Sequence, residues 1–226
     1  MNTRAGCLFI ALTIAARAIL AQTWSDLARL PGTRQEHTTL VLGPTELATI
    51  GGELGPNMTT SQVLLYSFTS DSWSQGPPLP VPLNHANAVA HGGKAYVFGG
   101  LLGIRFWPPS NDAWVFDPRS TYGTWKTLAQ LPAAAQPRGA AAMAVHNGTI
   151  YTFGGEGNTA PDSQGVFNNT EVYDTVTNSW RVLPPMRLPR HGTSAVGLRG
   201  EVYIPGGALV QGEGGTDVFD AFTPGS

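Results

Sequence analysis

The 226-residue sequence contains one cysteine, Cys7, and only 12% of its residues are charged. A single cysteine excludes an intrachain disulfide framework, so stability has to come from packing. The low charge content and a formal net charge of −2 leave no basic footprint for nucleic acid or for an anionic membrane surface. Nucleic acid and anionic membranes are therefore not expected as partners.

Long apolar runs are also scarce, and the longest stands at the N-terminus. It covers about twelve residues before Arg17 ends it, whereas roughly 20 are needed to span a bilayer. The pattern predicts a signal peptide over residues 1–21, cleaved after Ala18 or Ala21, and a retained membrane anchor is the alternative. We therefore expect a secreted, extracellular chain without membrane association, and cleavage removes Cys7 from it.

Three Asn-X-Thr sequons fit a secreted glycoprotein, at Asn57, Asn147 and Asn168. Asn147 lies in "HNGT", which is also a tight-turn signal between two strands. A turn asparagine has a structural use whether or not it carries sugar. Glycan occupancy therefore stays open at all three positions.

Glycine (28) and proline (18) together make up about a fifth of the chain, which indicates frequent turns. Glycines recur in pairs at the ends of similar strands, "LATIGGEL", "AYVFGGLL", "IYTFGGEG" and "VYIPGGAL". Tryptophans recur as well, and the spacing in both series is 48 to 55 residues. The two series are Gly51 and Gly52, Gly99 and Gly100, Gly154 and Gly155, Gly206 and Gly207, and then Trp24, Trp73, Trp125 and Trp180.

A third signal is an aromatic strand in each repeat, for example "EVYDTVTNSW" and "DVFDAF", and leucine and proline follow the tryptophans. These coincident periods resemble the kelch-repeat family of β-propellers, over nearly the whole stretch from Trp24 to about Phe222. The resemblance implies an all-β fold, with blades of four antiparallel strands around a central channel. The first repeat departs from the pattern, with "YSFTSD" in place of a compact "YD" strand.

The repeats predict four blades in a propeller over residues 22–226, at about 32–80, 81–131, 132–185 and 186–226. The last blade lacks a tryptophan strand of its own, so residues 22–31 are expected to supply its fourth strand and close the ring. Propellers of this family more often have five to seven blades. A compact, monomeric four-bladed ring is the first expectation, and the alternatives are a shortened relative of a six-bladed protein and an incomplete ring that pairs with another copy.

The glycine pairs are expected to be structural. Glycine allows another backbone or a large ring to approach where a Cβ would clash, and the tryptophan of the fourth strand is the expected ring. A phosphate cradle would need a following helix, and "GGEGNTAPDSQG" suggests none. The first strand of each repeat is rich in small residues, which suits strands that converge on a narrow hub.

Loops that enter each repeat and loops that follow each glycine pair emerge on one face, where the resemblance implies ligand binding. Arginine forks hold acidic groups and aromatic rings stack on sugars or peptides, so a protein or a glycan ligand is expected. Arginine before a strand often has only a structural role, and a tryptophan can fold under its own loop. The candidate ligand-binding residues are Arg34, His37, His85, Arg105, Trp107, Arg138, Arg190 and His191, with Glu53, Asn84, Phe106, Glu156, Asp162 and Glu213 beside them.

Enzymatic chemistry finds less support, and no catalytic residue, cofactor or metal is expected. The copper-radical oxidases that share the kelch fold need a tyrosine crosslinked to cysteine, and the mature chain has no cysteine. His85 and His91 would lie about 20 Å apart along a strand and cannot share an ion. A site that joins His37, His85 and His191 across the hub is geometrically possible.

The enzymatic alternative is a sugar-acid isomerase or epimerase of the kelch type. In that hypothesis an arginine holds the substrate carboxylate, and a glutamate or histidine moves the proton. The candidates are Arg34, Arg138 and Arg190 for the first role and Glu53, Glu156 and His191 for the second. A secreted protein with a purely structural role is a third possibility.

Overall fold

The computed structural model describes residues 24–55, 58–103, 108–121, 123–161 and 163–225. These residues form seventeen strands and one short 3-10 helix, η1 (Ala133–Ala135). No helix among them is long and apolar enough to cross a membrane. The signal peptide predicted for residues 1–21 lies outside the described residues, as does the sequon asparagine Asn57.

Three sheets each contain four antiparallel strands that pair in chain order, and every one of them fills one sequence repeat. The first contains β1 (Thr38–Gly43), β2 (Glu46–Ile50), β3 (Val63–Ser67) and β4 (Ser72–Gln75). The second contains β5 (Ala88–His91), β6 (Lys94–Leu101), β7 (Pro109–Phe116) and β8 (Lys126–Thr127). The third contains β9 (Ala142–His146), β10 (Thr149–Phe153), β11 (Thr170–Asp174) and β12 (Ser179–Leu183).

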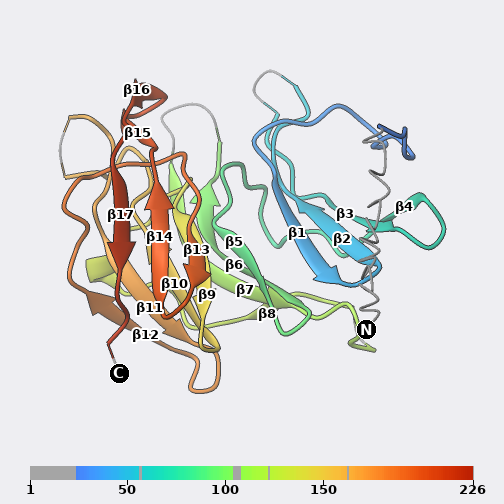
Figure 1. Ribbon diagram of the computed structural model, residues 1–226. Helices are drawn as coiled ribbons and strands as arrows, with labels where there is room; N and C mark the ends of the chain where they lie inside the picture. The colour runs from blue at the N-terminus through green and yellow to red at the C-terminus, as the bar shows by residue number, and fades with distance from the viewer. Residues whose placement is uncertain (1–23, 56–57, 104–107, 122, 162, 226) are drawn as a thin grey trace, which may run out of the picture.

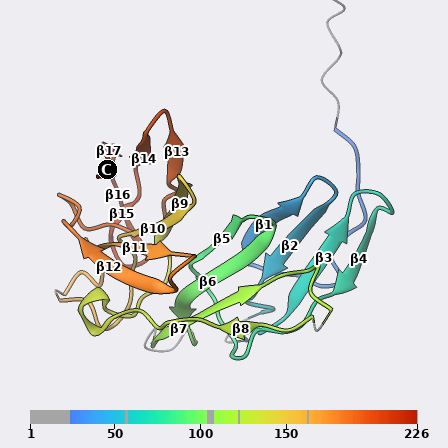
Figure 2. The ribbon, with the colours of Figure 1, turned by 90° about the horizontal axis from the view of Figure 1, so that it is seen from below.

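The last repeat departs from this pattern. Its main sheet has three strands, in the order β13 (Val196–Leu198), β14 (Glu201–Pro205) and β17 (Phe219–Phe222). The hairpin β15 (Ala208–Val210) and β16 (Glu213–Gly215) forms a separate two-stranded sheet between β14 and β17. The four larger sheets follow one another along an arc (Figures 1 and 2).

The described part of the chain does not form the closed ring expected from the sequence. β17 pairs only with β14, and residues 24–31 contain no strand. The N-terminal segment lies on the first sheet instead: the Ala28 amide donates to Asp71 at 2.8 Å, and the Ala28 carbonyl accepts from the Trp73 indole at 2.8 Å. Figure 2 shows this segment and β17 at opposite ends of the arc. The prediction that residues 22–31 complete the last blade is therefore wrong for this structure.

The contact between Trp73 and Ala28 recurs between successive sheets. The indole N–H of Trp125 donates to the Pro77 carbonyl at 2.9 Å, and that of Trp180 donates to the Ala129 carbonyl at 2.8 Å. Each acceptor lies four residues after the preceding tryptophan of the series Trp24, Trp73 and Trp125. We call this contact the tryptophan joint. In each case the indole of a tryptophan in or just before a fourth strand donates to the backbone carbonyl four residues after the preceding tryptophan of the series.

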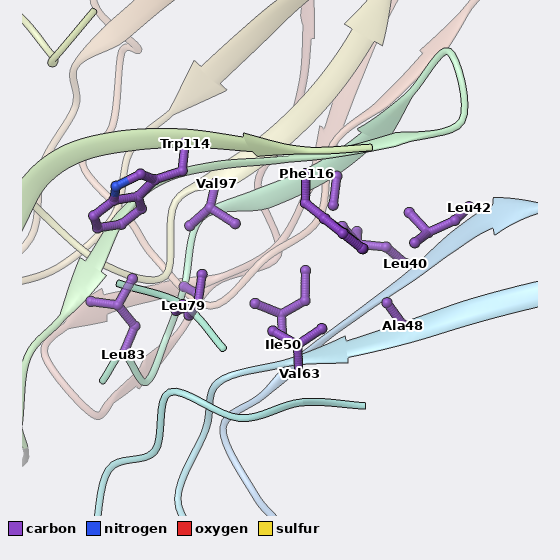
Figure 3. Packing of buried hydrophobic residues seen from close by; sticks show 12 residues of the cluster. Leu40, Leu42, Ala48, Ile50, Val63, Leu79, Leu83, Val97, Trp114 and Phe116 are labelled. Carbon is purple, nitrogen blue, oxygen red and sulfur yellow. The ribbon is translucent and has the colours of Figure 1, made fainter. Parts of the chain in front are cut away.

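Hydrophobic clusters fill the spaces between neighbouring sheets. Figure 3 shows the cluster in which Leu40 and Ile50 of the first sheet meet Val97, Trp114 and Phe116 of the second. Alternate residues of the inner strands, such as Leu40 and Leu42 of β1 and Ala48 and Ile50 of β2, point into these clusters, as the period of two along a strand requires. The small first strands contact one another from sheet to sheet, β1 with β5, β5 with β9 and β9 with β13. The core is therefore a series of layers between sheets.

The glycine pairs lie where one repeat meets the backbone of the next. A Cβ added to Gly154, whose φ is +59°, would lie 2.2 Å from the Arg190 carbonyl oxygen. The following amide, of Gly155, donates a hydrogen bond to that same oxygen at 2.9 Å. Gly51 stands in the same relation to the Leu83 carbonyl, at 2.3 Å. The close neighbour is thus a backbone carbonyl, and the expected tryptophan ring is not among the nearest atoms.

We expect Gly154→Ala to destabilise the protein by about 3 kcal/mol or more, because it combines left-handed backbone strain with a clash against a carbonyl that cannot withdraw. Gly92 is the matched control, since its φ is also +59° but nothing lies within 4 Å of an added Cβ. Gly92→Ala should cost about 1–2 kcal/mol. Urea unfolding measures both, and equal losses would show that the contact with Arg190 does not constrain the fold.

Candidate functional site

A left-handed turn precedes the first strand of every repeat. The residues with positive φ are Glu36 (52°), His85 (48°), Ala140 (50°) and Gly192 (62°). The turns join through their backbones: His85 donates to Glu36 at 3.1 Å, Ala140 to His85 at 2.9 Å, and Gly192 to Ala140 at 3.3 Å. We call these four residues the hub turns. Their hydrogen bonds gather the entry loops of all four repeats around one axis.

The loop after each glycine pair meets the entry loop of the same repeat through an isolated β-bridge. Gln35 bridges Glu53, Gly139 bridges Glu156, and His191 bridges Ala208. The structure therefore brings together the two kinds of loop that the sequence assigned to one face.

Two hollows adjoin the hub turns. One, of about 580 Å³, runs between the first strands and is lined by residues of all four repeats, including Thr38, Ala88, Met143 and Ser194. The other, of about 460 Å³, opens at the loop end, and we call it the mouth cavity. Its lining residues are Gln35, Glu36, Glu53, His85, Ala140, Glu156, His191, Gly192 and Gly212.

Glu156 is the central side chain of the mouth cavity. Only 1% of it is exposed. Its Oε1 lies 3.6 Å from Nε2 of His85 and 3.3 Å from Nδ1 of His191, whereas its Oε2 has no hydrogen-bond partner. A buried carboxylate oxygen without a donor is costly, so this atom can gain from a bound donor group.

Two further carboxylates extend the acidic character of the mouth cavity. Glu36 is half exposed and lies 3.1 Å from Nε2 of His85. Glu53 is buried, and its Oε2 accepts a hydrogen bond from Gln35 at 3.0 Å. Three glutamates thus face two histidines, and the cavity carries a negative charge when the imidazoles are neutral. Such a site favours cations and hydrogen-bond donors.

The histidines at the hub have shifted pKa values. Burial opposes protonation of His191, but hydrogen bonding and the charge of Glu156, helped by the Val210 carbonyl, raise its pKa above the ordinary value. The pKa of His37 is lowered, by burial first and by the positive charge of Arg34 second, while Glu36 opposes the shift. His191 is therefore the imidazole poised to carry charge beside Glu156.

Three of the four predicted arginines, Arg34, Arg138 and Arg190, do not line the mouth cavity. Arg138 and Arg190 are buried, the first paired with Glu171 and the second 2.9 Å from Asp220. Arg34 donates to the Gly51 carbonyl at 2.8 Å and to the Gln62 side chain at 2.7 Å. Their guanidinium groups donate to backbone carbonyls and side chains within the blades, which fits the structural role that was the alternative for these residues.

Three of the remaining sequence candidates lie at described positions away from the mouth cavity, and four lie outside the described residues. His37 lines the hollow between the first strands, and Asn84 is buried with its side chain on Thr59. Glu213 is exposed on β16. The four others, Arg105, Phe106, Trp107 and Asp162, lie outside the described residues. In the part of the chain that the structure describes, no three histidine, cysteine or acidic side chains form a cluster suited to a metal ion.

Glu36 is the charged residue of the mouth cavity that sequence reasoning missed. The available signal was its place in "RQEH", between Arg34 and His37, in the same kind of entry loop that carries His85. Glu171 and Asp220, which bind the buried arginines, were also missed. They occupy equivalent positions in β11 and β17, opposite Thr152 and Ile204.

Radially arranged four-stranded sheets, joined at a hub and sealed by layers of apolar side chains, define a β-propeller class of repeat protein. Residues 16–207 match the family model described as the KLHDC2/KLHL20/DRC7 Kelch-repeats domain. The chain belongs to the kelch-repeat family.

Individual relatives agree with this assignment. Kelch-like protein terF of Aspergillus terreus is 34% identical over 74% of this chain, and alpha-scruin of Limulus polyphemus is 26% identical over 84%. N-acetylneuraminate epimerase 2 of Escherichia coli is 29% identical over 68%. The chain spans only 35%, 20% and 39% of the lengths of these three relatives. The solved structure titled "Structure of YjhT" has the same fold, with a TM-score of 0.64 at 15% identity, over 89% of this chain and 85% of that one.

We expect Arg138→Ala to destabilise the protein by about 3–5 kcal/mol, because it leaves the Glu171 carboxylate buried without its cation. Arg119→Ala is the matched control, since that side chain is 69% exposed and pairs with Asp117 on the surface. The control should lose no more than about 1 kcal/mol. Denaturant unfolding of both variants measures the difference, and a small loss for Arg138→Ala would return this arginine to the list of free ligand-binding groups.

The raised pKa of His191 predicts a pH-dependent stability. The folded state favours the protonated imidazole, so this contribution is complete below the unfolded pKa of about 6.5 and is lost as pH rises through the higher folded pKa. The difference in melting temperature between the wild type and His191→Asn should therefore be larger at acidic pH than above neutrality. His146→Asn, on β9, is the control. A difference that grows with pH would contradict the pairing of His191 with Glu156.

Proposed function

We propose that this chain is a secreted binding module that recognises a protein ligand through the mouth cavity, and that the ligand inserts a basic group there. The observation that carries this proposal is the buried Glu156 carboxylate, whose Oε2 lacks a donor at the loop end of the hub. A lysine, arginine or free amine would supply that donor and would also be attracted by Glu36 and Glu53. Membership of a family whose domains generally bind proteins supports a protein ligand.

The proposed ligand group is basic, whereas the arginines in the sequence had led us to expect an acidic ligand group. Arg138 and Arg190 are buried within the blades and paired with Glu171 and Asp220, so these residues offer no fork to a ligand carboxylate. The polar side chains that remain at the mouth are chiefly acceptors. A glycan could also donate hydroxyl groups to Glu156, but a neutral sugar would gain nothing from the net charge of the site.

The test uses fluorescence polarisation with labelled, N-acetylated hexapeptide pools that contain one lysine or arginine, one glutamate, or no charge. The wild type should prefer the basic pool, and Glu156→Gln should weaken that binding by about tenfold or more, because the variant removes the charge that the ligand meets on desolvation. Glu46→Gln is the control, since Glu46 begins β2 at the end of the strand remote from the glycine pair.

Equal affinity for the three pools, or binding that Glu156→Gln leaves unchanged, would refute the basic ligand. Binding of the wild type to a neutral glycan array in place of the peptide pools would favour the glycan. The salt dependence gives a further check, because attraction at an open cavity weakens as ionic strength rises.

An isomerase or epimerase of acidic sugars is a second candidate. Glu156 and His191, 3.3 Å apart, form a pair able to exchange a proton, and one relative is named N-acetylneuraminate epimerase 2. The engaged arginines leave the substrate carboxylate without an evident holder, which is why this function ranks second. Incubation of the protein with acidic sugars in heavy water tests it, and absence of deuterium uptake at carbon would exclude it.

Secretion is part of the proposal and rests on residues 1–21 and on the sequons. Asn147 is exposed in the turn between β9 and β10, with φ of +48°, whereas Asn168 is half-buried before β11. Asn147 is therefore the more accessible acceptor for a glycan. The mass and N-terminal sequence of protein recovered from a eukaryotic culture medium would test both points.

A further inference from the structure

The tryptophan joint is repeated three times, and its fourth occurrence is incomplete. The acceptors Ala28, Pro77 and Ala129 each lie four residues after a tryptophan of the series. The same offset from Trp180 leads to Pro184. In the described residues, the last sheet has no fourth strand and so provides no indole for the Pro184 carbonyl.

The surroundings of Pro184 match those that hold Trp180 one repeat earlier. Trp180 packs against Phe98 at 4.6 Å and Tyr173 at 5.0 Å, and these two rings are 4.9 Å apart. Phe153 corresponds to Phe98, because both precede a glycine pair. Phe222 corresponds to Tyr173, because it pairs with Val202 of β14 as Tyr173 pairs with Ile150 of β10.

These equivalent rings line a real hollow. Phe153 and Phe222 lie 5.4 Å apart, and a cavity of about 380 Å³ opens beside them between the third and the last sheet. Its wall also includes Pro184, Met186 and Ile204. We call this cavity the β17 groove. It has the aromatic walls of a tryptophan joint, and in the other repeats an indole from a fourth strand occupies the equivalent place.

The backbone beside the β17 groove is equally open. β17 pairs with β14 on one side only, so its second edge presents unpaired amides and carbonyls. Phe219, at the start of the strand, is 66% exposed. An open edge next to an apolar hollow is suited to the addition of a strand, in which main-chain hydrogen bonds give affinity and a pocket gives specificity.

The chain itself carries a strand of the required kind. Trp24 begins "WSDLARLP", which repeats the pattern "WKTLAQLP" of the second repeat, and its side chain is fully exposed at 102%. Ala28, four residues later, already occupies the acceptor position of the joint with Trp73. Within the described residues, one end of the arc thus has a tryptophan segment without a groove, and the other end has a groove without a tryptophan segment.

We propose that the β17 groove binds the segment Trp24–Leu27 of a second copy of this chain as the fourth strand of the last sheet. The indole N–H of Trp24 then donates to the Pro184 carbonyl of the other copy, between Phe153 and Phe222. A second copy is the proposed source of the strand because the segment and the groove of one chain lie at opposite ends of the arc (Figure 2). The contact is heterologous, so two copies can close a ring by exchanging segments in both directions.

The first test measures mass by light scattering over a range of protein concentrations. The wild type should form a dimer or larger assembly as concentration rises, and Trp24→Ala should remain monomeric because it removes the ring that fills the groove. Val176→Ala is the matched control, since Val176 is 92% exposed on a turn of the third sheet, and it should assemble as the wild type does. A monomeric wild type at all concentrations would overturn the proposal.

The second test fixes the register and does not depend on stability. β11 and β12 place Val172 opposite Arg181, so the equivalent pair in the joint is Ala221 with Ser25. In chains with Cys7→Ser, Ser25→Cys and Ala221→Cys on separate molecules should form a disulfide-linked pair after mixing and mild oxidation. Val176→Cys in place of Ala221→Cys is the control and should form far less.

Equal crosslinking to the control position would overturn the proposed register. A chain that carries both Ser25→Cys and Ala221→Cys separates the two sources of the strand. A disulfide within single chains at high dilution would show that the segment closes its own ring, and that result would overturn the role of the second copy.

Discussion

Close contact between the backbones of neighbouring repeats is the constraint on which the rest of the structure depends. At Gly154 the chain approaches the Arg190 carbonyl so closely that a Cβ added to Gly154 would overlap the carbonyl oxygen. The Gly155 amide donates a hydrogen bond to the same oxygen. The hub turns make similar amide-to-carbonyl contacts between successive repeats. Because both sets of contacts act on the entry loops, the packing of one blade on the next fixes the positions of the side chains at the mouth cavity. The site is thus a consequence of how the repeats fit together.

The distribution of charge follows from the same packing. Arginine side chains tie the entry loops to strand ends, and Arg138 and Arg190 each reach a carboxylate on the third strand of their own repeat. Buried guanidinium groups need such partners, since a lone buried cation would be strongly disfavoured. The positive charges are therefore directed into the blades, whereas Glu156 and Glu36 are left at the opening. The sequence therefore suggests a basic site, whereas the described lining of the mouth cavity contains three glutamates and no arginine.

Much of the fold could be predicted from the sequence, because its signals are local and repeated. The glycine pairs and the spaced tryptophans located the repeats, and the small first strands indicated a hub. The directions of Arg138 and Arg190 could not be predicted, because their partners Glu171 and Asp220 lie 30 or more residues away, on a strand whose register the sequence does not state. The path of residues 24–31 was missed for a similar reason: the pattern identified the segment, but its hydrogen bonds with Asp71 and Trp73 bind it to the first sheet.

Both ends of the arc contribute residues to the mouth cavity. Glu36 comes from the first repeat and His191 from the last, so the opening is complete only while both terminal sheets keep their places. The last sheet has the least support, because it has three strands and β13 is exposed along its length. Any strand that binds along β17 stabilises this sheet by mass action and therefore also steadies Arg190, His191 and the turn at Gly192. Under the two proposals made above, completion of the last blade and ligand binding at the mouth act through one sheet, and each is expected to favour the other.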